Sequence, residues 1–154
     1  MPYREKTAWI SVVTTLLIWG FYSSQAIPPL LAGSADAGDF VGLLIGCTIL
    51  SIVFQIVLTV AAALMNPGDA EVAADERERL FELKASRIAY LIASTLAATV
   101  AVSSPFLIAA SPHLFPANPL GSAVLVMANG ILFALFVAEL IRAGVQIFHY
   151  RRAA

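Results

Sequence analysis

The chain alternates between long apolar runs and short polar segments, and this alternation predicts membrane-spanning helices. Two runs without a charged residue extend over positions 7–35 and 40–68, and a third extends over positions 88–138. A spanning helix needs about 20 residues at 1.5 Å each, so every run is long enough. The third run exceeds one crossing, and its segment 111–119 holds three prolines that we expect to interrupt the helix. The predicted spans are 7–27, 40–64, 87–110 and 120–146.

The positions of lysine and arginine predict how these spans are oriented. Every lysine and arginine lies in one of three segments, 4–6, 77–87 and 142–152, whereas the loops 28–39 and 111–119 have none. Basic residues stay on the cytoplasmic side of a membrane. Four spans place all three segments on that side, and three or five spans would not. We therefore expect an all-α, integral membrane four-helix bundle with both termini in the cytoplasm, forming one transmembrane domain.

The N-terminal run has an alternative interpretation as a secretory signal peptide. Arg4 and Lys6 precede the run, and Ser24-Gln25-Ala26 is an acceptable cleavage site. The apolar stretch is longer than the hydrophobic region of a typical signal peptide. We therefore expect a retained helix.

Composition supports a membrane protein and disfavours several other classes. Of the 154 residues, 60% are hydrophobic and 12% are charged, about half the charged share of a soluble domain. The net charge of −1 creates no field that attracts nucleic acid, so no direct nucleic-acid binding is expected. Cys47 has no second cysteine to pair with, and His113 and His149 fall on opposite sides of the membrane. Because no phosphate loop, nucleophile motif or His-Glu-x-x-His motif occurs either, we expect no enzyme activity, cofactor or metal.

Small residues predict how the helices pack, because helices associate in lipid where small side chains let backbones approach. The fourth span has Gly130, Ala134 and Ala138 at four-residue spacing, and the second has Gly42-x-x-x-Gly46. The third span has five alanines at the same spacing: Ala85, Ala89, Ala93, Ala97 and Ala101. We therefore expect the third and fourth helices to be the closest pair. We also expect Pro105 to kink or end the third helix, and the four short spans to associate as a homodimer or higher oligomer.

Polar residues inside the spans are candidate functional residues, because ionisable groups at membrane depth are costly. Glu139 lies about 18 Å from Arg151 along the fourth helix, and Arg142 follows it by three residues. Gln55 reaches a similar depth, and Asn129, the fourth candidate of this intramembrane polar cluster, lies nearer the middle. Two roles are open for a cluster of Glu139, Arg142, Gln55 and Thr59. It either holds the bundle together by hydrogen bonds, or it serves a small transporter or channel in which Glu139 binds a cation in a cavity shaped by Trp9, Phe136 or Tyr90.

The connector 65–86 is the one strongly polar element. Its second part, from Asp75, predicts a short cytoplasmic helix that extends the third span, with an Asp75–Arg79 pair and with Leu80, Phe81, Leu83 and Lys84 on one side. The charged candidates for a cytoplasmic interaction surface are Arg77, Arg79, Glu82, Lys84 and Arg87. A metal site at Asp69, Glu71, Asp75 and Glu78 is a weaker alternative, because these acids lack the spacing of a calcium loop.

Three blocks of the sequence resemble small four-span bacterial membrane proteins of unknown function. The blocks begin at Arg4-Glu5-Lys6-Thr7-Ala8-Trp9, at Asp75-Glu76-Arg77-Glu78-Arg79-Leu80, and at Ala138-Glu139-Leu140-Ile141-Arg142. The resemblance implies a location in the bacterial inner membrane, and a gene beside that of an Xre-type helix-turn-helix regulator. It implies no activity or catalytic residue. The function we expect is that of a non-enzymatic regulatory or interaction module that engages a cytoplasmic partner, such as a transcriptional regulator, and the alternative is the small transporter.

Overall fold

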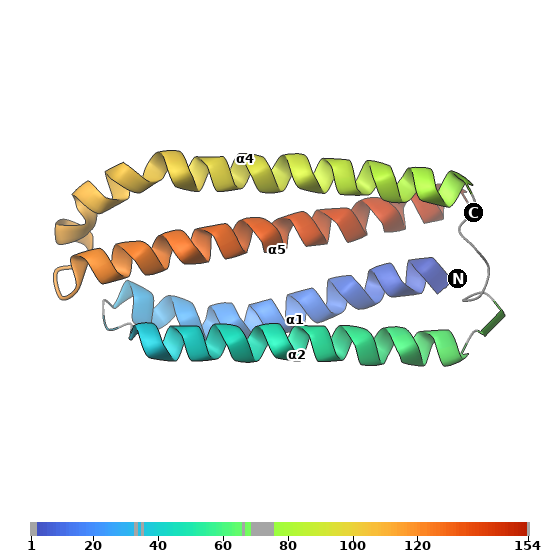
Figure 1. Ribbon diagram of the computed structural model, residues 1–154, viewed down its shortest axis with the longest axis horizontal. Helices are drawn as coiled ribbons and strands as arrows, with labels where there is room; N and C mark the ends of the chain where they lie inside the picture. The colour runs from blue at the N-terminus through green and yellow to red at the C-terminus, as the bar shows by residue number, and fades with distance from the viewer. Residues whose placement is uncertain (1–2, 33, 35, 66, 69–75, 154) are drawn as a thin grey trace.

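The computed structural model describes residues 3–32, 34, 36–65, 67–68 and 76–153 of the chain. Four long helices account for nearly all of these residues, and no strand occurs among them. The helices are α1 (Tyr3–Leu31), α2 (Ala37–Met65), α4 (Glu76–Leu114) and α5 (Pro119–Ala153), shown in Figure 1. Each is long and apolar enough to cross a membrane. The expected all-α, four-helix membrane fold is confirmed.

The helices run antiparallel to their neighbours in the order α2, α1, α5, α4 (Figure 1). Helix α1 packs against both α2 and α5, whereas α4 packs chiefly against α5. A third of the most apolar stretch of α1 is therefore buried, and none of that of α4. The two flanking helices present most of their apolar surface to the surroundings, as expected for helices that face lipid.

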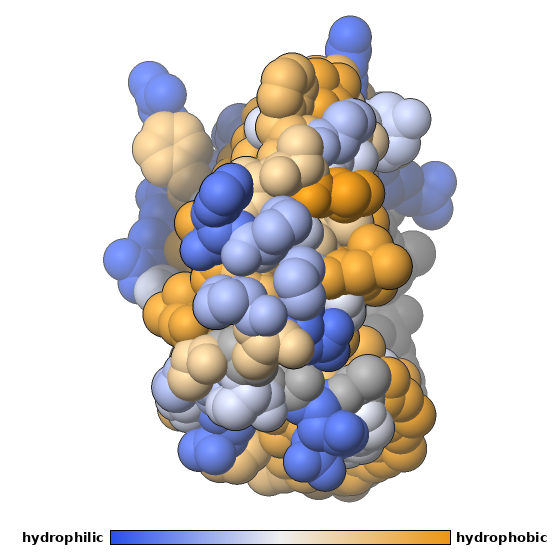
Figure 2. Space-filling model, turned by 90° about the vertical axis from the view of Figure 1, so that its left-hand side faces the viewer, coloured by the Kyte–Doolittle hydropathy of each residue, from blue (hydrophilic) through white to orange (hydrophobic). Residues whose placement is uncertain are grey.

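The two ends of the molecule differ in charge. One end, which we call the basic end, holds both termini and the start of α4, and all lysines and arginines lie toward it. The other end, which we call the loop end, holds the short links between α1 and α2 and between α4 and α5. Figure 2 looks onto the loop end, where hydrophilic residues gather over the tip and hydrophobic residues line the sides. This distribution fits a bundle whose ends reach out of the hydrocarbon.

Helices α4 and α5 form the most extensive helix pair, as the small residues predict. Ala85 and Ala89 of α4 are buried, but Ala101 is exposed, so the five alanines do not form one continuous seam. Four-residue spacing advances about 40° around a helix at each step, so Ala101 lies about 160° from Ala85. Farther along the pair, Gly130 of α5 lets the two helices approach closely, because a Cβ there would lie 3.0 Å from the Val100 side chain of α4.

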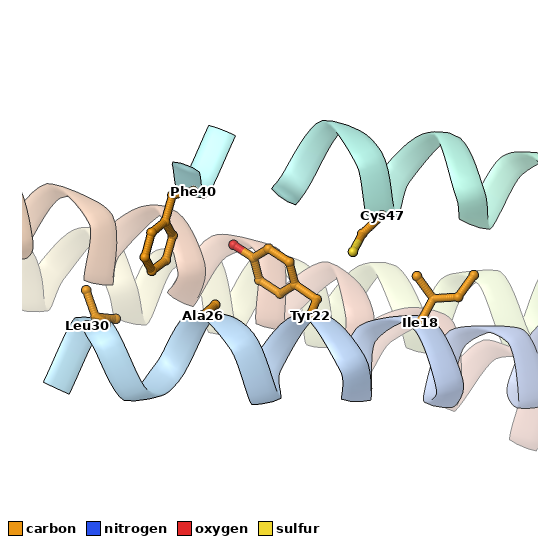
Figure 3. Close-up of a cluster of buried hydrophobic side chains, with 6 residues drawn as sticks. All are labelled: Ile18, Tyr22, Ala26, Leu30, Phe40 and Cys47. Atoms are coloured by element: carbon orange, nitrogen blue, oxygen red, sulfur yellow. The ribbon is translucent and has the colours of Figure 1, made fainter. Parts of the chain in front are cut away.

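The glycines of α2 were predicted to contribute to packing, and this prediction is wrong. Gly42 and Gly46 are exposed, and a Cβ added at either would meet nothing within 4 Å. Helix α2 instead contacts α1 through its opposite face, where Phe40 and Cys47 are buried. Figure 3 shows these two side chains pointing toward α1, from which Ile18, Tyr22, Ala26 and Leu30 point back.

Of the two outcomes expected at Pro105, a kink or an end of the helix, the end does not occur. The helix continues through Pro105 and Pro112 as far as Leu114, with a bend toward α5 near the loop end (Figure 1). Each proline leaves the carbonyl four residues before it without a backbone donor. Here the hydroxyls of Ser104 and Ser111 donate to those carbonyls, on Ala101 and Ile108, at 2.8 Å each. Such serine bonds let a membrane helix carry proline.

The predicted extension of the third span is confirmed, because α4 is one helix from Glu76 onward. Its apolar side chains do not share one side, however. Phe81 faces inward and stacks on His149 of α5, with ring centres 4.7 Å apart, while Leu80 and Leu83 are exposed. The predicted Asp75–Arg79 pair lies outside the described residues, as do three acids of the metal alternative, Asp69, Glu71 and Asp75.

Candidate functional site

Glu139 is the centre of a polar network that joins three helices inside the basic half of the bundle. Arg142, one turn later on α5, donates to both carboxylate oxygens, with Nε to Oε2 at 2.9 Å and Nη2 to Oε1 at 2.6 Å. Ser11 of α1 donates its hydroxyl to Oε1 at 2.6 Å. Gln55 of α2 donates from Nε2 to the Ser11 oxygen at 3.3 Å. The network therefore satisfies the carboxylate and ties α1, α2 and α5 together.

A polar cavity of about 170 Å³ opens beside this network, toward the basic end. Helix α1 lines it with Arg4, Thr7, Ala8 and Ser11. The other helices contribute Gln55, Thr59, Glu82, Arg142, Gln146 and Tyr150. All four helices therefore supply lining residues, and nine of these ten residues carry a polar side chain. Among apolar spanning helices, a hollow with such walls is suited to hold water or a polar ligand.

The lining follows from residue spacing along each helix. On α1 the polar positions Arg4, Thr7 and Ser11 are three or four residues apart, and on α5 the same holds for Gln146 between Arg142 and Tyr150. Residues three or four apart lie above one another on a helix, so each set forms a polar stripe. At 1.5 Å per residue, the α5 stripe from position 142 to position 150 is about 12 Å long. The cavity therefore follows the helix axes inward from the basic end.

Contacts between helices hold the mouth of the cavity in place. Arg4 Nε lies 3.1 Å from Glu78 Oε2, which joins α1 to the start of α4. Arg151 Nε lies 3.4 Å from Oε1 of Glu5, a buried carboxylate of α1. The guanidinium of Arg151 also lies over the ring of Trp9, 5.5 Å from its centre. With the stacking of Phe81 on α5, these contacts link α1, α4 and α5 at the basic end.

The structure brings most of the predicted intramembrane cluster together and leaves one member out. Glu139, Arg142 and Gln55 belong to the network, and Thr59 lines the adjoining cavity. Asn129 is separate, nearer the loop end.

Asn129 belongs to a second polar contact. Its Oδ1 accepts a hydrogen bond of 2.9 Å from the Tyr22 hydroxyl, and its Nδ2 donates to the Leu125 carbonyl at 2.8 Å. It borders a cavity of about 280 Å³ with Trp19, Phe133 and Phe136 in its walls. This second cavity is mainly apolar and aromatic, so its chemistry differs from that of the cavity at the basic end.

Ser11 is a member of the hydrogen-bond network that the sequence did not predict. A serine in a spanning helix often bonds to its own backbone, so its type gave no sign that it would bridge two other helices. The signal that could have found it is the polar spacing on α1, because Ser11 follows Arg4 and Thr7 at helical intervals. Its burial, with 2% of its surface exposed, depends on α2 and α5 packing over it.

The five predicted cytoplasmic interaction residues, Arg77, Arg79, Glu82, Lys84 and Arg87, are all exposed on α4. Glu82 differs from the four cations in one respect, because it also lines the polar cavity. Their role as an interaction surface stays a prediction.

The aromatic residues suggested for the alternative transporter cavity lie elsewhere. Trp9 stacks under Arg151, Phe136 contacts Trp19, with ring centres 6.5 Å apart, and Tyr90 is 72% exposed. None of the three lines the polar cavity within the described part of the chain. The cavity walls are hydroxyl, amide and charged groups instead.

Comparison with family models, curated proteins and solved structures finds no match to this chain. Within the residues described, no group of three or more histidine, cysteine, aspartate or glutamate side chains is placed to hold a metal ion. The chemistry of the site therefore has to be argued from its own geometry.

Proposed function

We propose that the protein is a regulatory or interaction module of the bacterial inner membrane, without enzyme activity, whose basic end faces the cytoplasm and binds a protein partner. The binding surface consists of the exposed cations of α4 (Arg77, Arg79, Lys84 and Arg87) and the exposed end of the C-terminal tail 142–152, with Arg151 and Arg152. Orientation follows from the position of every lysine and arginine toward one end. The expected partner is an acidic surface of a cytoplasmic transcriptional regulator.

One observation carries this proposal: the start of α4 is a fixed helix whose cations point outward. Glu78 and Phe81 attach its inner side to α1 and α5. Arg79 and Lys84 are left exposed on the outer sides. A helix that presents several exposed cations suits recognition of an acidic partner, because little backbone order has to be gained on binding.

Charge reversal tests the surface. The triple variant Arg77→Glu, Arg79→Glu and Lys84→Glu is expected to lose co-purification with the regulator encoded beside the gene, while it still inserts and unfolds like the unchanged protein. The control is Asp39→Asn, which alters charge at the loop end, adds no basic residue there and leaves the α4 surface intact. Binding that survives the triple reversal, or that is lost equally in the control, contradicts the proposal.

Orientation has its own test. On a Cys47→Ser background, the variant Arg79→Cys is expected to react with a membrane-impermeant maleimide only after the cells are opened. The control is Ser34→Cys at the loop end, which is expected to react in intact cells. Labelling of position 79 in intact cells would place the basic end outside and remove the basis for a cytoplasmic partner.

A homodimer is a further part of this proposal. It is supported by the outer face of α4, which is unpaired within the described chain and exposes Val102 and Phe106 to more than 70% each. On the Cys47→Ser background, Val102→Cys is expected to form a disulfide-linked dimer in membranes, whereas Leu64→Cys on α2 is not. Equal cross-linking at both positions would indicate random collision.

A small transporter or channel is the second candidate, because the polar cavity reaches Ser11 and Arg142, two hydrogen-bond donors to Glu139. The two-bond contact of Arg142 neutralises Glu139, which disfavours a carboxylate that exchanges protons. In reconstituted vesicles this candidate predicts that Glu139→Gln abolishes flux of a cationic solute and that the α4 triple variant does not. Flux that Glu139→Gln leaves unchanged dismisses it.

A further inference from the structure

We infer that the polar cavity at the basic end is a binding site for a small primary ammonium group, with the Glu82 carboxylate as its counter-charge. The inference goes beyond the proposed function, because it concerns the cavity between the helices and not the exposed cations of α4. It also does not require that the ligand crosses the membrane.

The charge of the cavity favours a cation. Two guanidinium groups line it, and each already holds a carboxylate: Arg4 pairs with Glu78 at 3.1 Å and Arg142 pairs with Glu139 at 2.6 Å. Glu82 is the third carboxylate. It is exposed where it lines the cavity, and it forms no hydrogen bond or ion pair to any described residue, although it is near enough to Arg142 and Tyr150 to interact with them electrostatically. Two positive and three negative charges leave one negative charge in and around the cavity. A carboxylate without an ion-pair partner in the wall of a polar cavity attracts a positive ligand.

The neutral groups around Glu82 fit a ligand with several N–H donors. Tyr150 and Thr59 supply hydroxyl oxygens, and Gln146 supplies an amide oxygen. No hydrogen bond is formed by these three side chains to the rest of the described chain. A primary ammonium has three donors and no acceptor, so one carboxylate with hydroxyl and amide oxygens can satisfy it. A divalent metal would find a single unpaired carboxylate here, which is fewer than such ions take.

The size of the cavity limits the ligand. Its volume of about 170 Å³ is similar to that of a protein cavity that holds one benzene molecule, so a ligand of roughly six non-hydrogen atoms fits. Two sources offer such a group: a free alkylamine from the aqueous phase, and the head group of phosphatidylethanolamine from the adjoining lipid. The ammonium chemistry is the same for both.

The test measures binding of n-propylammonium chloride to the full chain in phosphatidylcholine nanodiscs, by ligand-observed saturation-transfer NMR and by the shift in unfolding temperature. Saturable binding is expected, with propionate and tetramethylammonium binding about tenfold more weakly or not at all. Propionate lacks the positive charge, and tetramethylammonium keeps the charge but has no N–H donor. Binding of propionate in preference to propylammonium would overturn the inference, because the arginines would then define the site. Equal binding of tetramethylammonium would overturn it as well.

Three variants locate the site. Glu82→Gln keeps the shape and removes the charge, so propylammonium should bind about tenfold more weakly or not at all. Ala8→Leu places a larger side chain in the cavity wall and should reduce binding by exclusion. Asp39→Asn removes a carboxylate at the loop end and should leave binding unchanged. The unfolding temperature without ligand shows whether each variant is folded. Unchanged binding by folded Glu82→Gln overturns the inference.

Nanodiscs that contain phosphatidylethanolamine distinguish the two sources. If that lipid weakens propylammonium binding and Glu82→Gln removes the competition, the head group occupies the site. If binding is the same in both lipids, the ligand is a free amine. Both results support an ammonium site, whereas competition that persists in Glu82→Gln would place the lipid elsewhere and count against it.

Discussion

The two halves of α1 differ in what they bury. In the basic half the buried side chains include Glu5, Ser11 and Thr14, and in the loop half they are Ile18, Tyr22, Ala26 and Leu30. The polar half adjoins a cavity lined by hydroxyl, amide and charged groups. Phe40 and Cys47 of α2 pack against the apolar half of α1 (Figure 3).

The difference shows two ways of holding helices together in lipid. In the apolar half, close packing supplies dispersion contacts, and in the polar half, hydrogen bonds across helices satisfy groups that lipid cannot. The polar half is therefore sensitive to the loss of one partner, and the apolar half to a change in volume. The following variants test this distinction.

The largest effect is expected where one member of the ion pair is removed. Glu139→Leu leaves Arg142 without its carboxylate, and Arg142→Leu leaves Glu139 with Ser11 alone. Each should lower the free energy of unfolding by up to about 3 kcal/mol, which is the smallest loss typical of breaking a buried ion pair. The smallest value applies because both side chains keep about a third of their surface exposed. Unfolding in mixed detergent micelles measures the loss.

The matched control is the double variant Glu139→Leu with Arg142→Leu. It should lose less than either single variant, because no charge is left unpaired in the membrane. If its loss equals the sum of the two single losses, the side chains act independently and the network does not stabilise the polar half.

A volume change should separate the two halves. Ala26 in the apolar half and Ala8 in the polar half are both buried, with 1% and 3% of their surface exposed. Ala26→Leu overfills a packed site and should lower the free energy of unfolding by about 2 kcal/mol. Ala8→Leu should lower it by less than half as much, because its added atoms enter the cavity. Equal losses in the same micelle assay would show that the cavity beside Ala8 has no more space for the added atoms than the packed site at Ala26.

Among the described residues of the apolar half, the interhelical hydrogen bond from Tyr22 to Asn129 should make a smaller contribution. Tyr22→Phe keeps the ring and removes the donor to Asn129, which costs about 0.6 kcal/mol and at most about 1.7 kcal/mol in a membrane protein. Tyr90→Phe is the control, because Tyr90 is exposed to lipid or solvent. A loss for Tyr22→Phe as large as that for Glu139→Leu would show that the two halves depend on polar contacts alike.

The smallest effect is expected at the mouth of the polar half. Arg4 and Glu78 are each about a third exposed, so Arg4→Gln should lower the free energy of unfolding by under about 1 kcal/mol, less at high salt. Glu78→Gln should have a similar effect, and Arg79→Gln none. An effect of Arg4→Gln that does not change with salt concentration would indicate a packing role for the arginine stem instead of an ion pair.

Sequence patterns predicted the helices well and their contacts only in part. The helix number was predicted correctly from charge-free runs, and the α4–α5 pairing from small residues. The seam was wrong at Ala101 and the glycine motif of α2 was wrong. Of the kink or end expected at Pro105, the end does not occur. At the alanines and glycines, the residue pattern does not show which way each residue faces. At Pro105, the pattern does not show that a serine hydroxyl donates to the carbonyl that the proline leaves without a donor.

The candidate site shows the same limit. Glu139, Arg142 and Gln55 were expected together because each is a polar residue at a similar depth, which a rise of 1.5 Å per residue fixes. Ser11 and Glu82 were missed as members of the site because depth does not say which way a residue faces.

The sequence by itself determined how many helices form, how long they are and where the charges lie along them, because transfer from water to lipid is a property of each segment. The tertiary structure decided which stripes of those helices meet. It buried Ser11 between α2 and α5, placed Glu82 in the cavity and left Gly42 outside, because the rotation of each helix depends on the combined packing and hydrogen bonding of its neighbours.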